Sequence, residues 1–324
     1  MVKILYAGSP QAACDTLKIL FEKQTECGFE IAGVLSNPPA AKGRHKELVP
    51  TPVAAFAMEK GLPLFTPDHL DSDAREKIKP LSADLLLCFA YGHIFGPKFL
   101  SLFPLGGMNL HPSLLPKYRG CSPVPAAILN CDSQTAVTIQ TLSLAMDEGD
   151  ILSQSIVELT GKETGQSLLD YSAKCGAELF CELLKKLAAG QKLEGQPQKG
   201  EPSYTGIIKK EDGKINWAED GRKIEAKIRA YYPEPGCWTC IPSENSLPLR
   251  ILSSFFIPDS DSRASAYKSE ANGKVLSYVK SDGIYIKVNG GILSVTLLQR
   301  QGKKEMSYKD FMNGARDFIG TQLE

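Results

Sequence analysis

Two polar side chains at the end of an apolar run could act together on one bound group. Side chains alternate along a strand, so Asn109 and His111 would emerge on the same face of the run 108–111 (MNLH). Met108 and Leu110 would then face the core. A proline follows at once and cannot continue a central strand, and ligands of open α/β sheets bind where strands end. The pattern favours a site with two hydrogen-bond donors over a histidine buried only for packing.

An acidic turn follows the next strand-like run. The segment from Met146 to Ile151 reads MDEGDI. Carboxylates flank a glycine, so the backbone can turn tightly while an acid is presented from a loop at a strand end. Taken alone, this segment is typical of an Asp-rich surface turn. It gains weight only together with the Asn109 and His111 pair.

Other familiar site patterns are absent from the sequence. The first strand-like run ends in AGSPQA, with one glycine where the dinucleotide phosphate fingerprint needs three, so we exclude nicotinamide binding. There is no Walker A loop. Cys237 and Cys240 form a lone CxxC, whereas a structural zinc site needs four ligands. We therefore expect no metal. Histidines show no metal-ligand spacing with one another or with cysteines; they are His45, His69, His93 and His111.

The candidate residues need a scaffold that brings strand ends together, and the first half of the chain predicts one. Ile4–Ala7 breaks at a Gly-Ser-Pro turn, and Gln11–Glu22 then carries apolar residues at helical spacing. This alternation continues and predicts an α/β domain with a mostly parallel sheet and helices on both faces. The further strand candidates are Ile31–Ser36, Leu62–Phe65, Asp84–Ala90, Met108–His111 and Ala136–Leu142, with helices at Thr51–Lys60 and Ser72–Lys79.

A domain boundary is indicated after the long helical pattern of Ser167–Ala189. Residues 190–206 are polar and rich in glycine and proline, which is typical of a linker. We therefore predict a first domain at 1–189, a linker at 190–206 and a second domain at 207–324, a small β barrel or sandwich. Short β-rich runs separated by turns support it, at Leu249–Phe256, Lys274–Val279, Ile284–Val288 and Leu293–Leu298.

Composition restricts the partners and the compartment. The 324 residues include 37 Lys plus Arg and 37 Asp plus Glu, so any attraction to nucleic acid must be local. The nine cysteines are odd in number and scattered, as is typical of reduced thiols. Met1-Val2-Lys3 leads straight into a strand-like run, leaving no room for a signal or transit peptide, and no apolar run is long enough to span a membrane. We expect a cytoplasmic protein.

Together, the two polar segments resemble the formyltransferases that use 10-formyltetrahydrofolate. That family combines an Asn-x-His strand end, an SLLP-type loop and a later Asp in a D-x-G-[D/P]-I context. The matches here are Asn109/His111, Ser113–Pro116 and Asp147–Ile151. Within the family the chain looks like the branch that acts on methionyl-tRNA, and the resemblance covers nearly its whole length. Further matches lie at Tyr6–Pro10, Ala90–Gly92, Pro116–Gly120 and Gly302–Ser307.

The resemblance implies a fold and a reaction. The first domain would be Rossmann-like and the second a smaller OB-like β barrel. The enzyme would transfer the formyl group of 10-formyltetrahydrofolate to the amino group of methionine on initiator methionyl-tRNA for translation initiation. Asn109 and a protonated His111 would stabilise the oxyanion, each donor contributing about 3 kcal/mol. Asp147 would raise the pKa of His111 and hold a water-mediated path for the proton leaving the attacking nitrogen.

The resemblance also implies where the substrates bind. The folate would contact Ser113, Leu114, Leu115 and Pro116. The loop Asn37–Pro52 is longer than the usual link between a strand and a helix, and in the family it contacts the acceptor end of the tRNA. Lys42, Arg44 and Lys46 would contact tRNA here, with lysine at 42 where the family typically has arginine. Residues 207–324 would also bind tRNA. Neither a membrane nor a protein partner is implied.

Other functions share parts of this pattern. A formyltransferase acting on a sugar amine or on glycinamide ribonucleotide, and a hydrolase of 10-formyltetrahydrofolate, have the same Asn/His/Asp constellation. The long basic loop and the second β domain argue against them. A non-catalytic RNA-binding protein that retains an ancestral fold is disfavoured by the presence of Asn109, His111 and Asp147.

Overall fold

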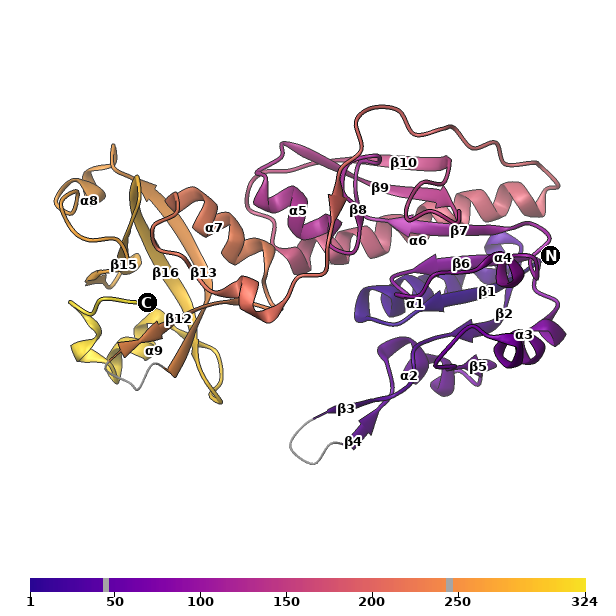
Figure 1. The fold of residues 1–324 in the computed structure, drawn as a ribbon, viewed down its shortest axis with the longest axis horizontal. Helices are drawn as coiled ribbons and strands as arrows, with labels where there is room; N and C mark the ends of the chain where they lie inside the picture. Colours follow the sequence, from indigo (N-terminus) through magenta and orange to yellow (C-terminus); the bar gives the residue numbers. More distant parts are fainter. Residues whose placement is uncertain (43–46, 243–246) are drawn as a thin grey trace. The chain divides into compact units, whose positions relative to one another are not determined.

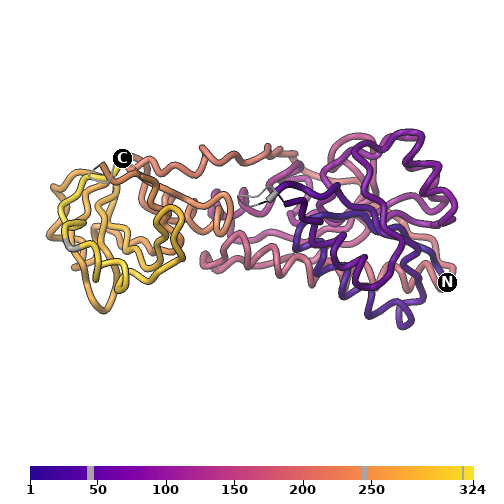
Figure 2. The backbone as a smooth tube through the Cα atoms, turned by 90° about the horizontal axis from the view of Figure 1, so that it is seen from below, coloured from indigo at the N-terminus to yellow at the C-terminus, as the bar shows by residue number. Residues whose placement is uncertain are grey.

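The computed structural model describes residues 1–42, 47–242 and 247–324, with the backbone alone at Lys42 and Arg316 (Figure 1). The chain forms two units. Unit 1 comprises residues 1–123, 134–158 and 168–205, and unit 2 comprises residues 124–133, 159–167 and 206–324. Figure 2 shows the N-terminus in unit 1 and the C-terminus in unit 2.

Unit 1 is built around a seven-stranded sheet with the order β10-β9-β7-β6-β1-β2-β5. The pairs from β5 to β7 are parallel, while β9 is antiparallel to β7 and β10 is antiparallel to β9. The mostly parallel sheet is therefore confirmed, although the edge strand β10 was not predicted. The strands are β1 (Val2–Gly8), β2 (Phe29–Leu35), β5 (Leu64–Phe65), β6 (Leu85–Phe89), β7 (Gly107–His111), β9 (Gln134–Thr141) and β10 (Ile151–Glu158).

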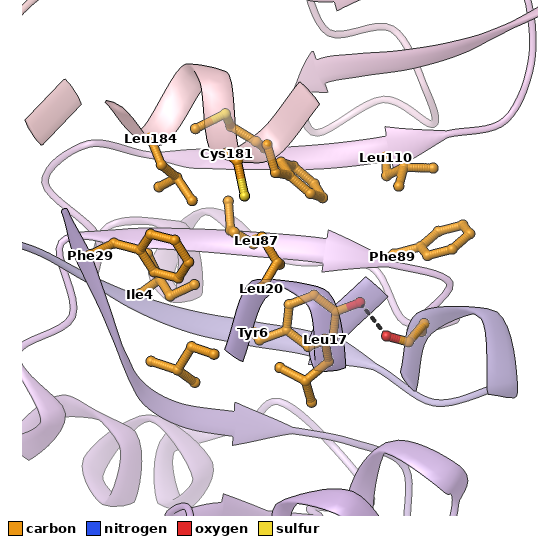
Figure 3. Packing of buried hydrophobic residues seen from close by; sticks show 14 of the residues in the cluster. Ile4, Tyr6, Leu17, Leu20, Phe29, Leu87, Phe89, Leu110, Cys181 and Leu184 are labelled. Carbon is orange, nitrogen blue, oxygen red and sulfur yellow. Dashed lines mark hydrogen bonds between the residues drawn. The ribbon is translucent and has the colours of Figure 1, made fainter. Parts of the chain in front are cut away.

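Helices cover both faces of this sheet because its central strands are apolar on both sides. Ile4 and Tyr6 of β1 pack in one cluster with residues of α1 and α6, and Figure 3 shows these side chains. Leu5 and Ala7 pack in a second cluster with residues of α3 and α4. The helices of unit 1 are α1 (Gln11–Cys27), α2 (Pro52–Glu59), α3 (Ser72–Ile78), α4 (Pro97–Leu100) and α6 (Gly165–Ala188), whereas α5 (Pro123–Leu129) belongs almost entirely to unit 2.

Two short strand pairs lie outside the main sheet. β3 (Ala40–Lys42) pairs with β4 (Glu47–Val49) within the long loop of the sequence prediction. β8 (Arg119–Gly120) pairs with β11 (Tyr204–Thr205). β11 lies near the end of the 190–206 segment, and residues 190–205 of that segment belong to unit 1.

Unit 2 contains an antiparallel sheet with the order β12-β13-β16-β15-β14, and β17 pairs with β16. All four strands predicted for the second domain are present, whereas β12 and α7 were not predicted. The elements are α7 (Gly221–Ala230), β12 (Cys237–Ile241), β13 (Leu247–Pro258), α8 (Ser262–Ser265), β14 (Val275–Val279), β15 (Gly283–Val288), β16 (Gly291–Arg300), β17 (Met306–Ser307) and α9 (Tyr308–Asn313).

The structure also describes the state of the cysteines and the length and polarity of the helices. Each of the nine cysteines is a free thiol, and five of them are buried, as the prediction of reduced thiols requires. Within the described ranges, each helix is too short or too polar to cross a membrane.

Candidate active site

The end of β7 carries the two polar side chains that the sequence singles out. Met108 and Leu110 are buried in the core on one face of the sheet. Asn109 and His111 therefore project from the opposite face, as strand alternation predicts. Across the sheet, Asn109 is paired with Gln140 of β9.

Asp147 reaches the same face from the turn between β9 and β10. Its Oδ1 accepts a hydrogen bond from Nε2 of Gln140 at 2.8 Å and lies 3.4 Å from Nδ2 of Asn109. Nδ1 of His111 is 3.5 Å from the same oxygen. Oδ2 accepts from the backbone N–H of Gly120 at 2.8 Å. The structure thus brings Asn109, His111 and Asp147 together around one carboxylate oxygen.

The turn that presents Asp147 depends on a close backbone approach. A Cβ at Gly149 would lie 1.7 Å from the carbonyl oxygen of Thr141, so only glycine fits there. Asp147 has a φ of 55°, in the left-handed region that residues other than glycine rarely adopt. Such strain persists where the surroundings hold the residue, and it is frequent at functional sites. The tight turn expected from the segment 146–151 is confirmed.

His111 is buried, and its two ring nitrogens face different partners. Nε2 lies 2.9 Å from the carbonyl oxygen of Tyr118. A carbonyl can only accept, so Nε2 carries the proton of the neutral ring. Nδ1 of the neutral ring then carries no proton, and it faces Asp147.

Burial acts against the protonated His111 that the resemblance implies. Burial lowers the pKa of His111, while the Asp147 carboxylate and the Tyr118 carbonyl raise it by less. The attraction to Asp147 is present as predicted, but the loss of water around a side chain that is only 5% exposed outweighs it. His111 is therefore neutral at neutral pH.

Gln198, which was not among the predicted site residues, holds the backbone of the Asp147 turn, and Arg119 orients it. Nε2 of Gln198 donates to the carbonyl oxygens of Asp147 and Gly149, both at 2.8 Å. Nε and Nη2 of Arg119 donate to Oε1 of Gln198 at 3.1 and 2.8 Å. No local sequence pattern indicates that Gln198 belongs to the site, because it lies in the segment predicted to be a linker.

Gln140 was also not predicted as a site residue, although the sequence contains a feature that could have indicated it. It is a polar residue inside the predicted strand Ala136–Leu142, and its side chain is 1% exposed. A buried amide in a strand must find hydrogen-bond partners. Pairing that strand with β7 would have placed Gln140 beside Asn109.

The four residues predicted to bind the folate differ in whether they are buried or line a cavity. Ser113 is buried, and its hydroxyl donates to the carbonyl oxygen of Lys117 at 2.6 Å. Its own carbonyl accepts from the Thr138 hydroxyl at 2.7 Å, so both polar groups are used internally. The next three residues line a cavity of about 630 Å³, whose other walls come from β10 and from residues between 194 and 201; they are Leu114, Leu115 and Pro116.

The loop predicted to contact tRNA forms the β3–β4 pair, in which Ala40 lies opposite Val49. Arg44 and Lys46 lie outside the described residues, and so does the side chain of Lys42. Their predicted contacts with tRNA stay predictions.

The lone CxxC lies on β12. Cys237 and Cys240 are opposite Ile251 and Pro248 of β13. Three residues apart on a strand, the two thiols point to opposite faces. In the part of the chain that the structure describes, no cluster of three or more His, Cys, Asp or Glu side chains could hold a metal ion.

Comparisons with known proteins identify the family of the chain. The formyl transferase family model matches residues 2–184, and the model of the formyl transferase C-terminal domain matches residues 207–316. A methionyl-tRNA formyltransferase of Treponema denticola is 41% identical over 336 residues, which cover 100% of both chains.

Two solved structures have a similar fold. A methionyl-tRNA formyltransferase from Clostridium thermocellum has a TM-score of 0.56 at 18% identity, covering 79% of this chain and 93% of that one. An N-formyltransferase from Helicobacter canadensis, in complex with folinic acid and dTDP-3-aminofucose, has a TM-score of 0.62 at 18% identity. That match covers 93% of this chain and 100% of the other.

Proposed function

The chain belongs to the formyl transferase family, and we propose that it transfers the formyl group of 10-formyltetrahydrofolate to the amino group of methionine on initiator tRNA. The product would be N-formylmethionyl-tRNA for translation initiation in the cytoplasm. One observation carries the proposal: Asn109, His111 and Asp147 meet at the end of a central strand. The full-length similarity to a methionyl-tRNA formyltransferase supports the choice of acceptor.

We assign the stabilisation of the oxyanion formed in the reaction to Asn109. When an amine attacks a formyl carbon, the carbonyl oxygen becomes an oxyanion, and an oriented N–H donor stabilises it by about 3 kcal/mol. Nδ2 of Asn109 makes only a 3.4 Å contact with Asp147. Because that contact is long, the amide can turn its N–H toward the oxyanion at little cost.

We assign the movement of the proton to His111. In the neutral ring, Nδ1 can accept the proton that the attacking nitrogen releases as its bond to the formyl carbon forms. The resulting imidazolium would be stabilised by the Asp147 carboxylate, 3.5 Å away. His111 can then pass that proton to N10 as the bond between N10 and the formyl carbon breaks. Atoms and charge balance without a covalent enzyme intermediate.

The donor supplies a formyl carbon already attached to N10 of tetrahydrofolate. We assign its binding to Leu114, Leu115 and Pro116, which follow the strand of His111 in the sequence. They line a cavity of about 630 Å³ whose walls do not include the catalytic residues. Ser113 would support this wall from inside, since its hydroxyl and carbonyl bond within the protein. Folinic acid in the Helicobacter canadensis relative supports a folate as the donor.

The tRNA is assigned to two regions. Lys42, Arg44 and Lys46 would contact phosphates of the acceptor end, and the second domain would bind the tRNA through an OB-like barrel. The proposed division is a catalytic domain at 1–189, a linker at 190–206 and a tRNA-binding domain at 207–324. The bounds of the two family matches, 2–184 and 207–316, support it.

A single-turnover assay tests this function. The purified chain, 10-formyltetrahydrofolate and charged initiator methionyl-tRNA should give N-formylmethionyl-tRNA. A sugar-nucleotide amine, glycinamide ribonucleotide and a reaction without acceptor serve as controls. Formylation of a small amine but not of the tRNA, or hydrolysis of the donor without transfer, would contradict the proposal.

A further inference from the structure

We propose that Gln140 is a positioning residue that holds the Asp147 carboxylate toward His111. Its amide would be oriented by a donor relay, defined as Arg119, Gln198 and Gln140 in that order. The inference rests on the proposed formyl transfer, in which Asp147 stabilises the protonated form of His111. No family motif quoted above includes Gln140 or Gln198.

The relay is a chain of hydrogen bonds with only one consistent direction. Arg119 donates to Oε1 of Gln198 at 3.1 and 2.8 Å. Nε2 of Gln198 shares its two hydrogens among three acceptors: Oε1 of Gln140 at 3.2 Å and the carbonyl oxygens of Asp147 and Gly149 at 2.8 Å. Nε2 of Gln140 then donates to Oδ1 of Asp147 at 2.8 Å. A guanidinium can only donate and a carboxylate can only accept, so both amides between them have a single orientation.

Gln140 makes the shortest contact with the oxygen that faces His111. At Oδ1 of Asp147, its bond of 2.8 Å compares with 3.4 Å to Asn109 and 3.5 Å to His111. A flipped Gln140 amide would place its oxygen against the carboxylate in a nearly dry site, which is costly for two acceptors. Because Gly120 holds the other oxygen, Gln140 decides how Oδ1 is presented to His111.

The first test replaces the amide with a side chain of similar length that cannot donate. Gln140→Met should lower kcat by about 10-fold to 100-fold, because a misplaced catalytic group loses rate on this scale. KM for the folate and for methionyl-tRNA should stay within about twofold, since Gln140 acts through Asp147. Gln24→Met is the control: Gln24 is a partly buried glutamine of α1 whose amide bonds backbone groups of Phe21 and Ile31, away from the site. Equal kcat in both variants would overturn the proposal.

The second test adds a readout that a packing role would not move. In Gln140→Glu, the new carboxyl can donate to Asp147 only when protonated. The rate relative to wild type at the same pH should therefore recover between pH 8 and 6, by up to about 10-fold per pH unit for one proton. A constant ratio over this range would show that Gln140 only fills space and would overturn the proposal.

The relay itself is tested with a double-mutant cycle of Gln198→Met and Gln140→Met. If Gln198 acts through Gln140, the double variant should lose less activity than the product of the two single losses. Independent, multiplicative losses would overturn the relay. Failure of the wild-type chain to formylate methionyl-tRNA would instead count against the proposed function. The two failures are therefore distinguishable.

Discussion

The surroundings of His111 have opposite effects on the protonation of its ring. The Tyr118 carbonyl fixes the proton of the neutral ring on Nε2, while Asp147 lies on the side of Nδ1 and favours a second proton. Burial opposes that second proton and prevails in the free protein. A base that is neutral at rest, with a carboxylate beside the atom that will be protonated, suits transient proton uptake.

The pH dependence of stability should reveal the neutral His111. Its pKa is lowered in the folded chain, so below pH 6.5 the unfolded chain binds a proton that the folded chain does not. Wild type should therefore lose stability relative to His111→Asn as the pH falls from 7.5 to 5.5, by at most about 1.4 kcal/mol per pH unit. Urea midpoints at each pH measure this. If the wild type instead became more stable relative to His111→Asn as the pH falls, His111 would be protonated in the folded state.

Asp147 should serve the transition state more than substrate binding. Asp147→Asn should lower kcat by about 10²-fold to 10⁴-fold, the range of acid–base contributions, with the Kd for tRNA nearly unchanged. Asp150→Asn is the control, because that carboxylate lies in the same turn and is exposed. A parallel loss of tRNA affinity in Asp147→Asn would assign Asp147 to binding instead.

The elements that carry the site were largely predictable, because their signals are local. Strand alternation placed Asn109 and His111 on one face, and the glycine at 149 marked the turn of Asp147. Gln198 was not predictable, since its contacts depend on the path of a long polar segment. The neutral state of His111 was also missed, because the burial of a side chain is a property of the folded chain and not of its neighbours in sequence.

The turn between β9 and β10 should tolerate no side chain at 149. In Gly149→Ala the Cβ would meet the Thr141 carbonyl, and backbone cannot move aside as a flexible side chain can. We expect a destabilisation of about 1–3 kcal/mol and a fall in kcat, because Asp147 is displaced with the turn. Thermal unfolding and kcat are measured together. Gly206→Ala, where an added Cβ meets nothing within 4 Å and φ is not positive, is the control and should change neither.

The whole molecule has no net charge, yet its proposed acceptor is a polyanion. Overall attraction therefore cannot bring tRNA to the site, and local groups of basic residues must supply the phosphate contacts. Lys42, Arg44 and Lys46 form such a group within five consecutive residues. The affinity for tRNA should therefore fall as the salt concentration rises.

Replacing Lys42, Arg44 and Lys46 with alanine should weaken tRNA binding and flatten its salt dependence. Each lost phosphate contact lowers the slope of log affinity against log salt by about 0.7–0.9, so three contacts predict a change of about 2 or more. KM for the folate should be unchanged, because the loop is assigned to the tRNA alone. The matched control removes three exposed lysines of the same unit, Lys77, Lys79 and Lys98. If both triple variants flattened the slope equally, the attraction would be non-specific and the loop would lose its assigned role.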